Sequence, residues 1–123
     1  MTSPDNFSHA ATVLPVQDVQ QSIRFYTESL PFELTFSWGT PVTYAVLKKG
    51  GVSVHLSERA DDQSPSKEHC AWYIFVYDLE QIYQHCLAKG VRIKNPPAER
   101  DYQMSDFDIE DPDGHIITFG KGG

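Results

Sequence analysis

Cysteine and long apolar runs are scarce in this chain, and each shortage excludes a class of protein. Two cysteines in 123 residues are too few for a disulfide framework, and the spacing of Cys70 and Cys86 does not fit a CxxC metal or redox motif, so both are interpreted as packed, reduced thiols. No run of about 18 apolar residues occurs, so no membrane-spanning helix is predicted. The first residues show neither a basic start nor an apolar stretch, and we expect a cytoplasmic protein with no membrane partner.

Positive charge is also in short supply. Lys and Arg total 10 against 17 Asp and Glu, which gives a formal net charge of −7. Nucleic-acid binding depends on basic patches, so nucleic acid is not an expected partner. The length and the 40% hydrophobic content fit one soluble globular domain spanning residues 1–123.

An internal repeat with an offset of 60 residues organises the chain. The segment 9–18 has a counterpart at 69–78, and both are apolar runs of strand length that end at an aspartate. Asp18 and Asp78 each precede a stretch with helical periodicity, and each has a glutamine three residues later. This spacing predicts two N-capped helices at equivalent places in the two halves.

Three strand candidates follow each predicted helix, so each half has the order βαβββ. The first module covers about residues 9–58 and the second about 69–120, with a polar linker over about 59–68. We therefore predict an α+β fold. The predicted strands after the helices are 33–38, 43–47 and 52–57 in the first module and 92–94, 106–109 and 115–120 in the second.

Two βαβββ modules with these motifs resemble the vicinal oxygen chelate superfamily, which contains glyoxalase I, extradiol dioxygenases, fosfomycin resistance enzymes and bleomycin resistance proteins. The resemblance implies a curved mixed sheet with helices on its outer face. Pro31 stands where the family usually has glycine, whereas VHLS at 54–57 and AW at 71–72 are most similar to bleomycin resistance proteins. The motifs that carry the resemblance are LPVQDV (14–19), FY (25–26), LPF (30–32) and DPDGH (111–115).

Enzymes of this superfamily hold a divalent metal with ligands from the first and last strands of each module. By resemblance the first-strand ligand positions are Ala11 and Ala71, and the last-strand positions are His55 and Thr118. A divalent transition metal needs about three or four converging ligands, and only His55 is a good one. We therefore expect no metal, no cofactor and no catalytic residue, which favours a binding protein over an enzyme.

Two other functions remain open. A metal-dependent lyase, isomerase or dioxygenase would need a displaced site made of His9, His55 and His69, of which His9 and His69 share strand faces with the usual ligand positions. A structural or regulatory protein with an empty cleft would need no ligand at all. Asp111 and Asp113 are acidic enough for catalysis, but in a Pro-Asp-Gly turn their expected role is local hydrogen bonding.

Strand alternation predicts which side chains line a cleft. Side chains that share a face with Ala11 and Ala71 include Val13, Pro15, Tyr73 and Phe75, and stacking on aromatic side chains suits a planar or cationic ligand. The irregular stretch 95–107 is interpreted as a lid. The candidate ligand-binding residues are Phe36, Trp38, Ser53, His55, Tyr73, Phe75, Tyr102, Met104 and Phe107.

The resemblance to bleomycin resistance proteins implies a homodimer with ligand clefts between the chains. It also implies sequestration of a hydrophobic or cationic small molecule without chemistry. Pro15 lacks a backbone N–H, so the first strand is expected at an edge or a strand crossing. Whether strands exchange between the subunits is left open.

Overall fold

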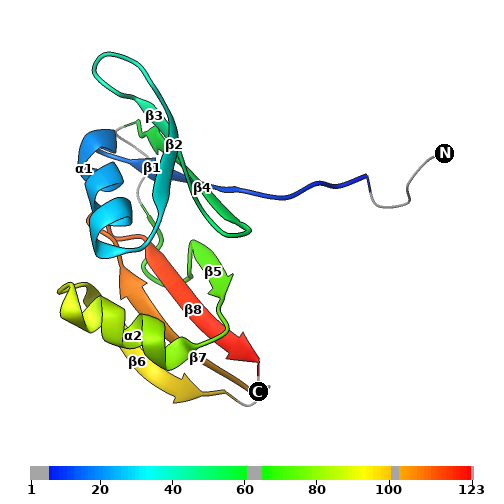
Figure 1. Cartoon of the computed structure of the whole chain (residues 1–123). Coiled ribbons are helices and arrows are strands. Elements are labelled where there is room, and N and C mark those ends of the chain that lie inside the picture. Colours follow the sequence, from blue (N-terminus) through cyan, green and yellow to red (C-terminus); the bar gives the residue numbers. More distant parts are fainter. Residues whose placement is uncertain (1–5, 61–64, 101–102, 123) are drawn as a thin grey trace.

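The computed structural model describes residues 6–60, 65–100 and 103–122 (Figure 1). Within these residues there are two helices, one π-helical turn and eight strands, and the order of one strand, one helix and three strands occurs twice. In chain order they are β1 (Thr12–Val16), α1 (Val19–Arg24), η1 (Phe25–Ser29), β2 (Glu33–Trp38), β3 (Tyr44–Lys49), β4 (Val52–Glu58), β5 (Trp72–Phe75), α2 (Leu79–Ala88), β6 (Arg92–Glu99), β7 (Met104–Glu110) and β8 (Ile116–Gly122).

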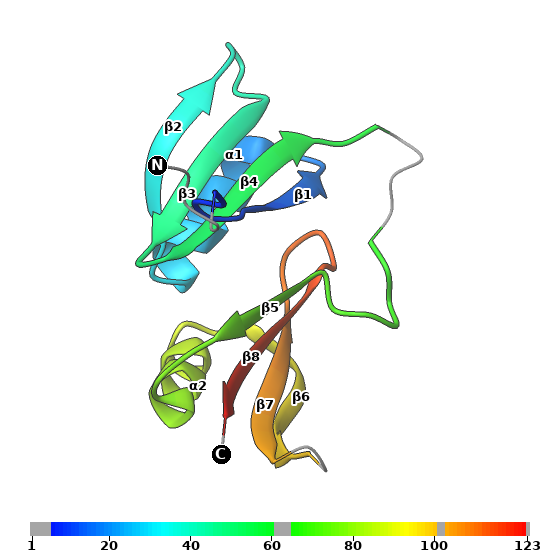
Figure 2. The ribbon, with the colours of Figure 1, turned by 90° about the vertical axis from the view of Figure 1, so that its right-hand side faces the viewer.

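The strands form two four-stranded mixed sheets with the same topology, which confirms the α+β fold of two βαβββ modules (Figure 2). The first sheet has the order β1-β4-β3-β2 and the second β5-β8-β7-β6. In each sheet the first strand is parallel to the last, and the other pairs are antiparallel. Because β1 is an edge strand, Pro15 lies at a sheet edge, as expected from its missing donor.

Both helices begin at the predicted aspartates. Asp18 Oδ1 accepts a hydrogen bond from the backbone N–H of Gln21 at 3.2 Å, and Asp78 Oδ1 accepts one from Gln81 at 3.0 Å. These bonds satisfy donors that a helix N-terminus otherwise leaves unpaired. α1 continues into the π-helical turn η1, which ends before Pro31. Among the described residues no helix is long and apolar enough to cross a bilayer.

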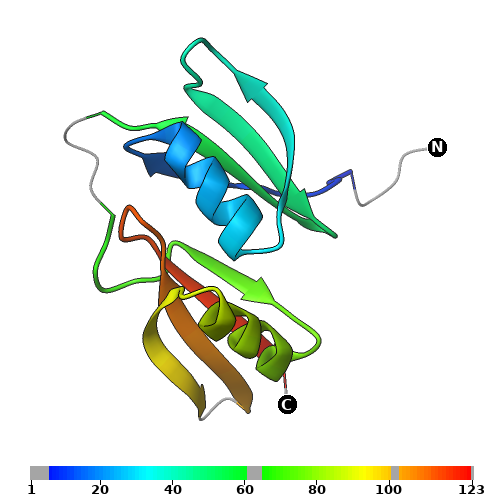
Figure 3. The ribbon, with the colours of Figure 1, turned by 60° about the vertical axis from the view of Figure 1, so that its left-hand side comes forward.

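The core lies between each sheet and its helix. Figure 3 shows α1 and α2 on the same side of the molecule, in front of the two sheets. Side chains alternate along the strands, so Leu14 and Leu56 in the first sheet and Ile74 and Ile117 in the second are buried against the helices. Among the residues that the structure describes, no helix covers the opposite face of either sheet, and we call this the open face of that sheet.

A β-bulge in β2 determines which side chains of this strand lie on the open face of the first sheet. Leu34 pairs with Leu47, but Phe36 pairs with Val46, so Thr35 is an extra residue in the ladder. Thr35 Oγ1 donates a hydrogen bond to the carbonyl of Val46 at 3.1 Å. Leu34 therefore lies on the helix side, while Phe36 and the residues after it change phase and reach the open face.

The DPDGH turn between β7 and β8 fastens the second module to the first. Asp111 Oδ1 accepts from the backbone N–H groups of Asp113 and His115 at 3.0 and 2.8 Å, which confirms the expected local role. Asp111 Oδ2 accepts from the Tyr26 hydroxyl at 2.8 Å, across 85 residues of sequence. Burial raises the pKa of Asp111 and raises that of Tyr26 well above its usual value.

Further polar contacts strengthen this junction. Asp113 Oδ1 accepts from the backbone N–H of Gln17 at 2.8 Å, and His115 Nε2 lies 2.6 Å from the carbonyl oxygen of Pro15, to which it donates. The DPDGH motif therefore holds the two modules together through hydrogen bonds. This role was not predicted, because only hydrogen bonds within the turn were expected.

The expected lid over residues 95–107 was wrong for the part of it that the structure describes. Strand β6 runs on to Glu99 and β7 starts at Met104. Pro96 and Pro97 are accommodated because β6 is an edge strand with register shifts between Asn95 and Ala98. Tyr102 lies outside the described residues.

The two cysteines differ in environment. Cys86 is buried on α2, as expected, and burial raises the pKa of its thiol to about 11. Cys70 is exposed, so the expectation of a packed thiol was wrong there.

Candidate functional site

The open face of the first sheet carries an aromatic surface. Strand register places Phe36, Val46, His55 and Val13 in one row across the sheet. The next row contains Trp38, Tyr44, Ser57 and Pro15. Both rows follow from alternation once the bulge in β2 is taken into account, and both face away from the helices.

Large apolar side chains on this face are accessible. Trp38 is 66% exposed, Phe36 51% and Val13 54%. Single exposed apolar residues are common on proteins, but a contiguous group of them marks an interaction or ligand surface. A hollow of about 600 Å³ lies here, within the range of small-molecule sites. Its lining residues are Phe36, Trp38, Thr43, Tyr44, Ser57 and Glu58.

His55 stands in the middle of this surface and is half-buried. The Tyr44 hydroxyl and His55 Nδ1 are 2.5 Å apart, and the two rings meet edge to face with centroids 5.5 Å apart. Tyr44 was not among the residues predicted for the site. Its alternation with Val46 in a strand next to that of His55 is the sequence signal that could have identified it.

The open face of the second sheet is polar. Asp106, Asp108 and Glu110 alternate along β7, a spacing that puts all three carboxylates on one face. Sequence reasoning missed them, although the acid-x-acid-x-acid pattern of 106–110 was available as a signal.

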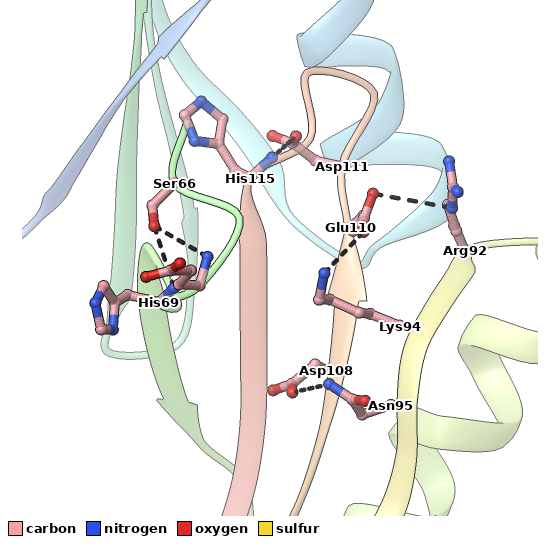
Figure 4. A network of polar contacts seen from close by, with 10 residues as sticks. Ser66, His69, Arg92, Lys94, Asn95, Asp108, Glu110, Asp111 and His115 are labelled. Atoms are coloured by element: carbon pink, nitrogen blue, oxygen red, sulfur yellow. Dashed lines mark hydrogen bonds and ion pairs between the residues drawn. The ribbon is translucent and has the colours of Figure 1, made fainter. Parts of the chain in front are cut away.

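Each of these carboxylates has a partner. Asn95 Nδ2 donates to Asp108 Oδ2 at 2.7 Å, and Lys94 Nζ lies 3.5 Å from Glu110 Oε1 (Figure 4). Arg100 Nε lies 2.7 Å from Asp106 Oδ1. Lys94 and Asn95 belong to β6, and Arg100 directly follows it. This edge strand therefore orients the three carboxylates of β7.

Tyr73 and Phe75 bring aromatic surface to this second face. Their ring centroids are 4.9 Å apart, and Phe75 is 68% exposed. The Tyr73 hydroxyl donates to Asp106 Oδ2 at 3.2 Å. A hollow of about 320 Å³ lies beside Tyr73, lined also by Lys94, Asn95, Arg100, Asp106, Asp108 and Thr118.

Gly120 makes the position of Tyr73 possible, and this yields a prediction. A Cβ on Gly120 would lie 2.6 Å from Tyr73 Cζ, so Gly120→Ala must displace the ring and its bond to Asp106. We expect a loss of about 1 to 3 kcal/mol in the free energy of unfolding, measured by urea denaturation. Gly122→Ala is the matched control, because nothing lies within 4 Å of a Cβ there. Equal effects of the two substitutions would contradict this interpretation.

The remaining predicted residues have different environments. Ser53 is buried beside a separate hollow of about 390 Å³ that Tyr73 and Phe75 also line. Met104 is half-buried in β7. Phe107 was wrongly placed at the cleft: it is fully buried on the helix side, where its ring packs against Tyr83 of α2.

Some of the residues considered as metal ligands form other hydrogen bonds. Thr118, at one of the expected ligand positions, donates its hydroxyl to Asp108 Oδ1 at 2.6 Å. His9 bonds to Ser8. Across the described part of the chain, no three His, Cys, Asp or Glu side chains are grouped so that they could hold a metal ion. The displaced constellation of His9, His55 and His69 is therefore not assembled within these residues.

Two βαβββ modules, each pairing its first strand with its last, define a single class of fold. The chain belongs to the glyoxalase/bleomycin resistance protein/dioxygenase superfamily, whose family model matches residues 6–119.

Several individual proteins are similar to this chain in sequence or in fold. Bleomycin resistance proteins from Geobacillus stearothermophilus and Staphylococcus aureus are 28% identical over 122 residues, covering 86% of this chain and 90% of theirs. TioX from Micromonospora sp. ML1 has a TM-score of 0.78 at 18% identity, covering 95% of this chain and 100% of TioX. TnmS3, an antibiotic binding protein from Streptomyces sp. CB03234, has a TM-score of 0.75 at 20% identity, covering 96% and 98%. The structural likenesses show the fold alone.

Proposed function

We propose that this protein binds and sequesters a hydrophobic or cationic small molecule without performing chemistry on it. The observation that carries the proposal is the exposed aromatic face of the first sheet, where Phe36 and Trp38 border a hollow of about 600 Å³. Relatives named bleomycin resistance protein also support a small-molecule ligand. Binding by stacking needs no catalytic group and no metal.

The net negative charge of the chain supports a cationic ligand. The chain carries a formal charge of −7, and on the second open face Asp108 accepts from two neutral groups, Asn95 Nδ2 and the Thr118 hydroxyl, whereas Asp106 and Glu110 face cationic side chains. A low-dielectric cleft lined by carboxylates raises the local concentration of cations. Aromatic faces also attract cations through the ring quadrupole, so the two open faces favour the same ligand charge.

A homodimer with clefts between chains would bring these two faces together. Within the described residues, no strand pairs with the outer edges of β1 and β5. Unpaired edges beside exposed apolar surface favour association with a second copy. In the dimer that we propose, the first open face of one chain is opposite the second open face of its partner.

The proposed function is tested with metal-free bleomycin as the probe. We expect it to quench the tryptophan fluorescence of the EDTA-treated protein in a saturable way, with about one ligand per cleft, because Trp38 borders the hollow. No change up to about millimolar bleomycin, an affinity weaker than about −4 kcal/mol, would reject this ligand. Stoichiometric Mn, Fe, Ni or Zn in protein purified without chelator would instead favour the metal-dependent enzyme.

A further inference from the structure

We propose that Tyr44 holds the His55 ring in the tautomer that carries its proton on Nε2, so that the first open face offers one fixed hydrogen-bond donor. The inference rests on the proposed function, because it states which chemistry the ligand must carry. That ligand is a planar aromatic group with an acceptor atom at its edge, such as a carbonyl oxygen or a ring nitrogen.

The contact between Tyr44 and His55 determines the tautomer. The phenol oxygen lies 2.5 Å from Nδ1, within hydrogen-bonding distance, and the two rings meet edge to face with their planes 89° apart. A neutral imidazole has one proton, and the hydrogen bond at one nitrogen decides which nitrogen carries it. A phenol is a better donor than an imidazole N–H, and an imidazole nitrogen is the better acceptor. Tyr44 therefore donates to Nδ1, and the proton is on Nε2.

The surroundings of His55 leave the Nε2 proton for a ligand. Val13 and Val46 lie directly opposite His55 on the two neighbouring strands, and neither side chain accepts a hydrogen bond. Over residues 6–60, 65–100 and 103–122, no hydrogen bond other than that of Tyr44 reaches the His55 ring. Because the ring is half-buried, water competes only in part for this donor.

The aromatic residues place a ligand beside this donor. Phe36 lies in the same row as His55, with Val46 between them, and Trp38 is opposite Tyr44 in the next row. Tyr44 lines the same hollow as Phe36 and Trp38, so a flat ring stacked on those two side chains lies next to the Tyr44 end of the Tyr44–His55 pair. Recognition then combines stacking, which tolerates many rings, with one hydrogen bond, which selects among them.

The tautomer is measured without any ligand. Long-range ¹H–¹⁵N spectra at about pH 8, where histidine is ordinarily neutral, distinguish the two nitrogens of His55. We expect a protonated Nε2 and an unprotonated Nδ1 in the wild type, and a mixture of tautomers in Tyr44→Phe. A protonated Nδ1 in the wild type, or an unchanged single tautomer in Tyr44→Phe, would overturn the role of Tyr44. This result does not depend on bleomycin, so it fails separately from the proposed function.

The donor is tested with quinoline and naphthalene, which have nearly the same shape but differ in one acceptor nitrogen. We expect quinoline to shift the His55 resonances and to bind about two- to tenfold more tightly than naphthalene, the effect of one neutral hydrogen bond. His55→Gln keeps a donor and should keep part of this preference, whereas His55→Leu should abolish it. Equal binding of both probes to the wild type, or no shift with quinoline, would refute the donor role.

Discussion

Replacing Asp111 with alanine is expected to lower the free energy of unfolding by about 3 to 4 kcal/mol, because two buried donors and one part-buried donor lose their acceptor at once. These donors are the Tyr26 hydroxyl and the backbone N–H groups of Asp113 and His115. Chemical denaturation at pH 7 measures the loss. A decrease of less than about 1 kcal/mol would show that the junction between the modules does not depend on this carboxylate.

Asp111→Asn is the matched control, since it keeps the shape and one acceptor oxygen but removes the charge. Burial raises the pKa of Asp111 in the folded state, so the folded protein binds more protons than the unfolded chain above the ordinary value of 3.8. The stability of the wild type relative to Asp111→Asn should therefore fall as the pH rises from 3.8 toward the raised pKa. A relative stability that rises over this interval would contradict the assigned direction.

Trp38→Ala is expected to weaken bleomycin binding about thirtyfold, or about 2 kcal/mol, which is typical of a central aromatic contact. The change removes the most exposed ring that lines the first open face, while Trp72 stays in the core. Calorimetry is the appropriate measurement, because the substitution also deletes a fluorophore. Tyr77→Ala is the matched control: Tyr77 is 99% exposed and does not line this hollow. Equal losses in both variants would refute the assignment of the face.

A mixed dimer tests whether each cleft uses two chains. Trp38→Ala alters the first open face and Phe75→Ala the second, so a cross-chain cleft leaves one intact site in a heterodimer of the two variants. We expect half the sites to bind with wild-type affinity after co-expression and purification of that heterodimer. Weak binding at every site would place each cleft within a single chain.

Much of the fold could be predicted because its determinants are local. Asp18 and Asp78 cap helices through a glutamine N–H three residues away, and the offset between them reveals the repeated module. Alternation correctly assigned Leu14 and Ile74 to the core. These features need only the sequence near each residue and the period of a strand or helix.

The misjudged features depend on contacts distant in sequence. Nothing near Asp111 indicates that Tyr26 is its partner, because the two are 85 residues apart. The Pro96-Pro97 pair reads as irregular until β6 is known to be an edge strand, where missing donors are tolerated. Phe107 was placed in a lid because nothing near it in the sequence indicates that α2 packs over β7 and buries its ring.

The bulge at Thr35 has a consequence for aligning this chain with its relatives. In a regular ladder Thr35 and Ser37 would face outward and Phe36 and Trp38 would turn toward α1, although no residue had changed. An alignment that matches every amino acid of β2 can therefore misassign which side chains lie on the first open face if the relative has no bulge. The set of side chains that such proteins present on this face follows backbone phase as much as residue identity, so the irregular hydrogen-bond ladder has to be compared together with the sequence.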